Sequence, residues 1–499
     1  MTQDQPPPEI ATACPATAQT EAAAPAANLP PSEKGKLLLL LSFMVIWYGS
    51  GLAITGFRSG RSPLYLVFNS MFAHLIHGRF DVDPNIVGLE GFGHNGHVYA
   101  YWGIWCALLR FPLWIIGRLD WNVTTWSCLV AVCIATMAKC RAVFLLRRYA
   151  LHNKTAKAAT EIMLIYFLLG GSATGYLRAS VFQEVVFWAA AFGAIFVYLA
   201  IKGLISEQFT LGTLSGMALC AGLALLTRVS TGIGLVCALG LLLLVLVLRK
   251  RIAAAPNRRF ALQWISLLGD RRVFIPLGIV STFVAITGLI NYFRWGNPLT
   301  FADYRFYLGN VDWPDRIQRE ATYGNFNFRR IPFALMYYIF PVWTHRLADG
   351  HYLFEPTQLR LFDDVELPPM SFLLTDLIAF CFIAFLVMGL VKRRHCFVPS
   401  IAQISAIAAG LAAPCLLMLM AISTTYRYRM EFYPEFDFLA LLGLYAVLID
   451  KELQSKFERW RSWIIAALVL CIIASHCALL LYDISPFGPG IDRLRRGFI

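Results

Sequence analysis

Long apolar runs separated by shorter polar stretches fill the chain from position 37 to position 482. A membrane-spanning helix needs about 20 mainly apolar residues, and several of these runs are short or interrupted, so we expect roughly 11–13 spans. The pattern therefore predicts an all-α polytopic membrane protein. The candidate spans are 37–57, 98–118, 123–146, 160–177, 181–201, 209–227, 230–248, 273–293, 331–344, 371–391, 398–422, 434–450 and 462–482.

Composition supports the same class of protein. The chain is 58% hydrophobic and 15% charged, whereas a soluble domain is about 45–50% apolar and about 25% charged. This excludes soluble enzymes and secreted domains, and also outer-membrane barrels, whose strands give only a weak alternating pattern. The cysteines lie mostly inside apolar runs and form no Cys-X-X-Cys pair, so neither a zinc site nor a redox motif is indicated.

The formal net charge of +13 reflects Lys and Arg residues gathered between the apolar runs. This is the positive-inside bias of membrane proteins, and it does not indicate nucleic-acid binding. The strongest cytoplasmic marks are the segments 249–272, 392–394 and 451–461. Seven candidate spans lie between Lys36 and Arg249, and an odd number would put these two residues on opposite sides. One candidate must therefore be re-entrant, lateral or merged with a neighbour.

The ends and loops suggest a simple domain organisation. Residues 1–33 are polar and rich in Pro and Ala, which predicts a disordered cytoplasmic tail. Residues 34–499 form one transmembrane domain, and Lys34 and Lys36 place its start in the cytoplasm. Two long polar segments, 58–97 and 294–330, then fall on the same, non-cytoplasmic face as a first and a second external loop.

The first external loop carries the most informative chemistry. Apolar residues recur at helical spacing between Pro63 and His77, as in a helix that lies in the membrane interface. Acidic and histidine side chains follow it: Asp81, Asp83, Glu90, His94 and His97. Carboxylates held above a bilayer can act as a general base or bind a divalent cation. The alternative is a solvated loop that turns at Asp83-Pro84.

Several charged residues lie at the edges of spans. Arg427 and Arg429 stand between two spans in TTYRYRMEFYP, where arginines are costly and often functional, although they can also snorkel to the interface. Arg178 and Glu184 flank another turn, and Glu184 can equally serve a helix N-terminus. Arg228 lies in an apolar hairpin, where an internal ion pair is the alternative.

The second external loop contains Asp303, Tyr304, Arg305, Asp312 and Asp315. These side chains either shape the acceptor side of a site or are simply solvated. Tyr304 is the one that we place among the binding residues.

Four segments, in this order along the chain, resemble motifs of the GT-C superfamily of membrane glycosyltransferases. They are NGHVYAYWGIWCALLRFP, GLALLTRVSTGIGLV, YFRWGNPLTFADYRFY and TTYRYRMEFYPEFDFLALLGLYAV. The superfamily includes the protein O-mannosyltransferases, the lipid A aminoarabinose transferases and the RgtA/B/C/D-like bacterial enzymes. The resemblance covers most of the chain from Lys36 onward, and the shared order of the segments is more specific than any one of them.

This resemblance implies transfer of a hexose or pentose from a polyprenyl-phosphate donor to a lipid or glycan acceptor at the periplasmic face of a bacterial inner membrane. It implies a catalytic acid in the first external loop. Many relatives carry that acid before the interfacial helix, where this chain reads Arg58-Ser59-Gly60-Arg61-Ser62. Asp83 or Asp81 would then be catalytic. The residues expected to bind the donor phosphate and substrate are Arg427, Arg429, Arg228, Arg178, Glu184, Glu90, His94 and Tyr304.

Two other functions remain open at this stage. A transporter or flippase of a lipid-linked sugar would show buried charges in the middle of spans and paired broken helices, whereas a catalytically inactive membrane scaffold would fit the missing early acid. The cofactor is likewise unknown, with a divalent cation as the candidate.

Overall fold

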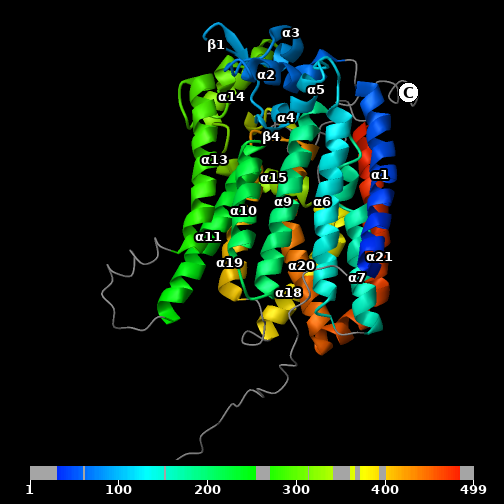
Figure 1. The fold of residues 1–499 in the computed structure, drawn as a ribbon. Helices are drawn as coiled ribbons and strands as arrows, with labels where there is room; N and C mark the ends of the chain where they lie inside the picture. The colour runs from blue at the N-terminus through cyan, green and yellow to red at the C-terminus, as the bar shows by residue number, and fades with distance from the viewer. Residues whose placement is uncertain are drawn as a thin grey trace, which may run out of the picture.

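The computed structural model describes residues 31–59, 62–150, 153–253, 270–312, 314–340, 360–365, 371–392 and 400–483. The protein is a bundle of long helices whose one end is covered by short helices and loops (Figure 1). The all-α polytopic fold is thereby confirmed, since seven described helices are long and apolar enough to cross a membrane. The predicted disordered tail lies, up to residue 30, outside the described residues.

The bundle contains helices of two lengths. The seven long ones are α1 (Pro31–Ser59), α6 (Thr124–Arg147), α9 (Val181–Ile205), α11 (Val229–Ala253), α13 (Arg271–Trp295), α19 (Ile401–Met420) and α21 (Lys451–Asp483). Four shorter ones run among them: α7 (Lys154–Leu169), α10 (Leu211–Leu225), α18 (Leu377–Lys392) and α20 (Tyr433–Ile449). In the part of the chain that the structure describes, these eleven bundle helices agree with the expected number.

Short elements make up the covered end, which we call the cap. From the first loop come η1 (Pro63–Leu66), α2 (Val67–Leu75), α3 (Pro84–Val87), η2 (Gly88–Glu90), β1 (Phe92–His94), β2 (His97–Tyr99), α4 (Trp105–Leu108) and α5 (Phe111–Ile115). Further short elements occur later in the chain: α8 (Ser172–Gly175), η3 (Tyr304–Phe306), η4 (Leu308–Val311), α14 (Asp315–Tyr323), η5 (Phe328–Arg330), α15 (Ile331–Tyr338), β3 (Asp364–Val365), α17 (Phe372–Thr375), β4 (Ser423–Thr424) and η7 (Tyr426–Glu431). Of these, α14 lies in the cap, whereas α15 lies among the bundle helices (Figure 1). Strands β1 and β2 pair antiparallel, and β3 and β4 pair parallel.

The candidate span 98–118 is not a continuous helix. It breaks into the short helices α4 and α5, which lie in the cap (Figure 1). The break follows from the sequence, because Arg110 and Pro112 interrupt the apolar run. Without this candidate an even number of bundle helices separates Lys36 from Arg249, which removes the conflict between span count and basic residues. The candidate 331–344 is also short, with α15 only 8 residues long.

The helix expected between Pro63 and His77 is present as η1 and α2. It lies across the end of the bundle, and its apolar face is buried through Val67, Phe68 and Met71. The apolar face of this amphipathic helix thus covers the outer ends of the spanning helices.

The two long loops meet in the cap. The backbone N–H of Leu308 donates to the carbonyl of Gly91 at 2.9 Å, and Phe92 forms a β-bridge with Tyr307. The ring of Phe92 also lies 5.7 Å from that of Trp295 at the end of α13. Residues more than 200 positions apart therefore form one continuous surface at this end of the bundle.

Small residues let two pairs of bundle helices approach closely. A Cβ placed on Gly410 of α19 would lie 2.1 Å from the backbone nitrogen of Ala238 in α11. A Cβ on Gly443 of α20 would lie 1.8 Å from the carbonyl oxygen of Phe382 in α18. Membrane helices associate largely through such close backbone packing, because lipid offers no hydrophobic driving force between them.

A fully buried ion pair joins the cap to α9. Arg110 donates from Nη1 and Nη2 to the two carboxylate oxygens of Glu184, at 2.6 and 2.8 Å, and both side chains are 0% exposed. Nε of Arg110 donates to Oδ1 of Asn69 in α2 at 3.1 Å. Asn69 in turn donates to the carbonyls of Leu119 and Trp121, so one connected group holds α2, the segment after α5, and α9.

Breaking this pair on one side should destabilise the fold strongly. We expect Glu184→Gln to lower the free energy of unfolding by about 3–5 kcal/mol, because it leaves the Arg110 guanidinium buried without its charge partner. Thermal unfolding of the purified protein in detergent measures the loss. Glu458→Gln is the matched control, since Glu458 is exposed in α21; equal melting temperatures for the two variants would contradict the prediction.

Candidate functional site

A short 3-10 segment between α19 and α20 supplies the first part of the site. In this segment, η7, the guanidinium of Arg427 lies 4.7 Å from the ring centroid of Phe182 and 5.7 Å from that of Tyr428. Phe182 is held in place because Ser180 caps the start of α9, where its side chain accepts the N–H of Gln183. Arg427 thus extends from η7 toward the outer end of α9.

Glu90 brings a carboxylate to Arg427 from the first loop. It ends η2, just before β1, and it interacts with Arg427, Arg316 and the hydroxyl of Tyr307. Burial raises the pKa of Glu90, while these three neighbours oppose the rise. A carboxylate with a raised pKa can accept a proton more readily near neutral pH, which is what a general base requires.

The second loop completes this side of the site. Arg316 of α14 lies 4.8 Å from the ring centroid of Tyr307 and 5.9 Å from that of Tyr304. Its Nε donates to Asp363 at 2.5 Å. Burial, followed by the charge of Glu90, raises the pKa of Tyr307 to about 12, so the phenol stays protonated and able to donate to Glu90.

Arg228, the residue directly before α11, adds a second guanidinium group to the site. Its guanidinium lies 5.2 Å from the ring centroid of Tyr428, and Nε donates to Glu431. Tyr101 interacts electrostatically with Arg427, Glu90 and Arg228. We call this group the arginine–tyrosine cluster: Glu90, Tyr101, Arg228, Tyr304, Tyr307, Arg316, Arg427 and Tyr428.

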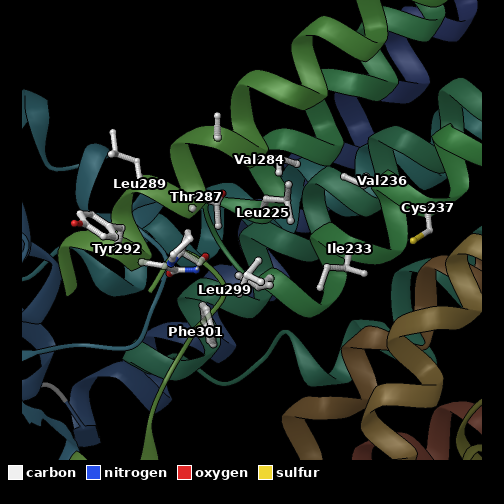
Figure 2. A pocket seen from close by; sticks show the side chains of 15 residues that line it. Leu225, Ile233, Val236, Cys237, Val284, Thr287, Leu289, Tyr292, Leu299 and Phe301 are labelled. Carbon is white, nitrogen blue, oxygen red and sulfur yellow. Dashed lines mark hydrogen bonds between the residues drawn. The ribbon is translucent and has the colours of Figure 1, made fainter. Parts of the chain in front are cut away.

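An apolar groove begins beside this cluster. It has a volume of about 700 Å³ and is lined by α10, α11, α13 and the segment 298–301. Figure 2 shows side chains of both long helices bordering it, among them Ile233 of α11 and Val284 of α13, together with Leu299 of the segment 298–301. Val229 lines the groove directly after Arg228 in the chain, so the apolar groove and the cluster of guanidinium groups are neighbours.

The two aspartates that were expected to be catalytic have other contacts. Asp83 caps α3, with its carboxylate accepting the N–H of Asn85 at 2.8 Å. Asp81 is buried and accepts hydrogen bonds from Nδ1 of His74 at 2.9 Å, from Nδ1 of His97 at 3.1 Å and from Arg79. Glu90 lies within electrostatic range of Arg427, whereas the hydrogen bonds described for the two aspartates are made to other groups.

Asp81 links separate parts of the first loop through its hydrogen bonds. Burial alone would raise its pKa, but the hydrogen bonds from Arg79, His74 and His97 outweigh this, and the pKa lies below its usual range. These groups come from the end of α2, the turn after it and the start of β2. Asp81 thus ties the β1–β2 hairpin to the helix beneath it.

Four other residues that were expected to bind the donor or substrate have different surroundings. Glu184 and Arg429 are buried in ion pairs, Glu184 with Arg110 and Arg429 with Asp376 at 2.8 Å; these contacts join helices, and a role of either residue in binding stays a prediction. Arg178 is half-buried in the segment before α9. His94 packs its ring 4.5 Å from that of Phe306 at the edge of the cluster.

Sequence reasoning missed a second set of buried charges deep in the bundle. Lys139, in the middle of α6, pairs with Asp437 of α20 at 2.7 Å and donates to Ser172. Asp376 accepts from Tyr166 as well as from Arg429. Charged residues within apolar spans were the available signal.

Several residues of the cluster carry no signal in the sequence. Tyr101 was indistinguishable from an interfacial aromatic, and Arg316 from a solvated loop charge. Glu431 lies in the same sequence segment as Arg427, but the sequence does not show that its side chain contacts α11. Among the described residues, no group of three or more His, Cys, Asp or Glu side chains is arranged to hold a metal ion, and the divalent cation stays a prediction.

Fold and site together define a polytopic all-α membrane protein with an arginine- and tyrosine-lined site at one end. No protein-family model matches the chain, and no curated protein matches it. The chain is similar to solved structures of an oligosaccharyltransferase from Archaeoglobus fulgidus. One is the enzyme AglB in complex with an inhibitory peptide and a dolichol-phosphate, with 12% identity, 90% of this chain and 56% of that chain covered, and a TM-score of 0.44.

A second is the apo form of an Archaeoglobus fulgidus oligosaccharyltransferase, at 13% identity and a TM-score of 0.43, with 90% and 55% of the two chains covered. A third, a complex with Zn and sulfate, has 13% identity and a TM-score of 0.41, with 90% and 53% covered. The chain therefore spans a little over half the length of these structures. TM-scores below 0.5 do not establish a common fold.

The Asp81 contacts make the stability of the first loop dependent on pH. Because its folded pKa lies below the unfolded value of about 3.9, ionised Asp81 stabilises the loop at neutral pH. This contribution is lost as the pH falls below about 4 toward the folded pKa. Hydrogen exchange of the β1–β2 hairpin should differ most between wild type and Asp81→Asn at pH 7, and the difference should shrink in acid. A difference that grows on acidification would contradict this, and Asp83→Asn serves as the control.

Proposed function

We propose that this protein is a membrane glycosyltransferase of the GT-C type that transfers a hexose or pentose from a polyprenyl-phosphate donor to a lipid or glycan acceptor. The observation that carries the proposal is the arrangement of Arg228 and Arg427 at the ring of Tyr428, beside an apolar groove and with Glu90 within electrostatic range of Arg427. One side of the site can bind phosphate, and the other can bind a long apolar chain.

The cluster suits the chemistry of glycosyl transfer. Glu90 would take the proton of the acceptor hydroxyl while its oxygen attacks the anomeric carbon of the sugar. The bond between that carbon and the phosphate oxygen breaks, and the electron pair leaves with the polyprenyl phosphate. Arg427 and Arg228 would stabilise the leaving anion, because guanidinium groups pair with phosphate in bidentate geometry. In this proposal Glu90 takes the role that the sequence suggested for Asp83 or Asp81.

The groove supports a lipid-linked donor. Its lining is almost wholly apolar and lies between α11 and α13, two helices of spanning length (Figure 2). A prenyl chain in the groove would place its phosphate at the end marked by Val229, next to Arg228. A soluble nucleotide-sugar would leave this apolar surface unused.

Charge distribution supports the orientation of the protein. The end of the bundle opposite to the cap, where α11 ends and α13 begins, carries Arg249, Lys250 and Arg272 (Figure 1). Lys250 forms a salt bridge with Asp270 there. The positive-inside rule assigns such an end to the cytoplasm. The cap and the cluster would then face the periplasm of a bacterial inner membrane, with the N-terminus in the cytoplasm.

One observation favours a second function. The buried pair of Lys139 and Asp437 resembles the intramembrane charges of transporters, and a transporter or flippase of the lipid-linked sugar would use them. In vesicles, movement of donor across the bilayer without formation of a glycoside would favour this alternative. Glycoside formation on the cap side alone would favour the transferase.

Substitutions of Glu90 and Asp83 should differ clearly in their effect on glycosyl transfer. Glu90→Gln keeps the size of the side chain but removes the base, and we expect at least a 100-fold loss of transfer, as is typical for general-base catalysis. Asp83→Asn keeps a good N-cap and should stay within about threefold of wild type. Release of polyprenyl phosphate from donors carrying a panel of hexoses and pentoses is the measurement. The reverse ranking of the two variants would overturn the assignment.

A bulky residue in the groove should discriminate donors by chain length. Ala285 lines the groove, and Ala285→Trp fills part of it. We expect the KM for a long-chain donor to rise about tenfold, equal to about 1.4 kcal/mol, while a short-chain analogue is affected little. Leu277→Trp, at an exposed position of α13 outside the groove, is the control. An equal effect on both donors would argue against a prenyl chain in the groove.

A further inference from the structure

The segment η7 is fixed at two buried residues, Arg429 and Glu431. Arg427 and Tyr428 belong to the cluster, whereas Arg429 and Glu431 are 3% and 1% exposed. Nη2 of Arg429 donates to Asp376 at 2.8 Å, and its guanidinium lies 4.1 Å from the ring centroid of Phe372. The six-residue segment that carries Arg427 is therefore held at two points, both of which follow Arg427 in the chain.

Glu431 makes the second of these attachments, and its carboxylate accepts hydrogen bonds from three residues at the beginning of α11. Its Oε1 accepts from Nε of Arg228 and, at 2.8 Å, from the hydroxyl of Ser230. Its Oε2 accepts from the hydroxyl of Thr231 at 2.6 Å. A carboxylate at this point also meets the positive end of the α11 dipole. Glu431 thus fixes η7 directly to the helix that borders the apolar groove.

The contact between Glu431 and Arg228 leaves the far end of the Arg228 guanidinium able to bind an anion. Glu431 uses Nε, the nitrogen nearest the side-chain stem, while the two Nη groups lie at the far end of the planar guanidinium. The same guanidinium lies over Tyr428, and its side chain is 18% exposed, against 1% for Glu431. Arg228 can therefore hold Glu431 and an anion at the same time.

We infer that Glu431 is a positioning residue of the donor site, which orients Arg228 toward the phosphate and sets the distance between Arg228 and Arg427. The inference rests on the proposed function, because the phosphate is that of the polyprenyl donor. Without Glu431, Arg228 would lose the carboxylate that fixes its stem, and the two guanidinium groups would no longer converge on one anion. The groove, lined by α11 and α13, does not depend on this contact.

Binding of lipid to the full-length protein in nanodiscs tests this inference without knowledge of the sugar. The probes are a long-chain polyprenyl phosphate and the matching neutral polyprenol. We expect Glu431→Gln to raise the Kd of the phosphate about tenfold and to leave polyprenol binding unchanged, a selectivity that a general loss of structure does not produce. Glu452→Gln, at an exposed position of α21, should leave both unchanged.

A double-mutant cycle identifies the path of the effect. If Glu431 acts through Arg228, the double variant Glu431→Gln/Arg228→Lys should have the same Kd as the single variant that binds the phosphate less tightly. If the two residues act independently, their fold-changes in Kd should multiply. Glu431→Asp, which keeps the charge but is shorter by one methylene, replaces Gln if that variant does not fold, and the same selective rise is expected. Unchanged phosphate binding, an equal loss of both lipids, or multiplied effects would overturn the inference. Wild-type protein that does not prefer the phosphate to the polyprenol would instead overturn the proposed function, and the inference with it.

Discussion

A carboxylate can be buried in a membrane bundle only if a cation is buried beside it, and the cap of this protein depends on that constraint. Desolvation of an isolated charge costs far more than a single hydrogen bond returns. Four buried acids each join a segment that carries part of the site, or a helix beneath it, to another helix. The pairs are Glu184 with Arg110, Asp437 with Lys139, Asp376 with Arg429, and Glu431 with Arg228.

These pairs explain why short, irregular elements can hold a defined site. Helices as short as α4 or η7 have little stability of their own, and their backbone groups need partners wherever water is excluded. Ion pairs with fixed geometry restrict such segments in a way that apolar packing against lipid does not. Removing one partner is therefore expected to displace a segment of the site, and not merely to weaken a helix contact.

Much of the fold is predictable from sequence, and the failures have physical causes. The apolar runs predict the bundle helices, and the spacing from Pro63 to His77 predicts η1 and α2, because both signals are local. The run 98–118 misleads because its average hydropathy hides Arg110, whose partner Glu184 lies 74 positions away. The charge of Lys139 is visible in the sequence, but its tolerance in the bundle requires Asp437, which no local pattern indicates.

The site itself was predictable only in part, for a related reason. Arg427, Arg228, Tyr304 and Glu90 were all recognised as candidates, yet which acid would meet Arg427 depends on how the first loop folds. Asp83 precedes Pro84 and Asn85, a pattern typical of a helix N-cap, and this local role occupies its carboxylate. Glu90 has no such local role.

The boundary between the apolar groove and the cluster falls between two consecutive residues, Val229 and Arg228. This position follows from the start of α11, because a helix that begins at the membrane surface exposes its first N–H groups and its N-cap region to polar partners. Glu431, Ser230 and Thr231 meet there, while the next turns of α11 border the groove. An amphiphilic ligand with an anionic head and an apolar chain matches this change over a single helical turn. A wholly polar or wholly apolar ligand would use only one side of it.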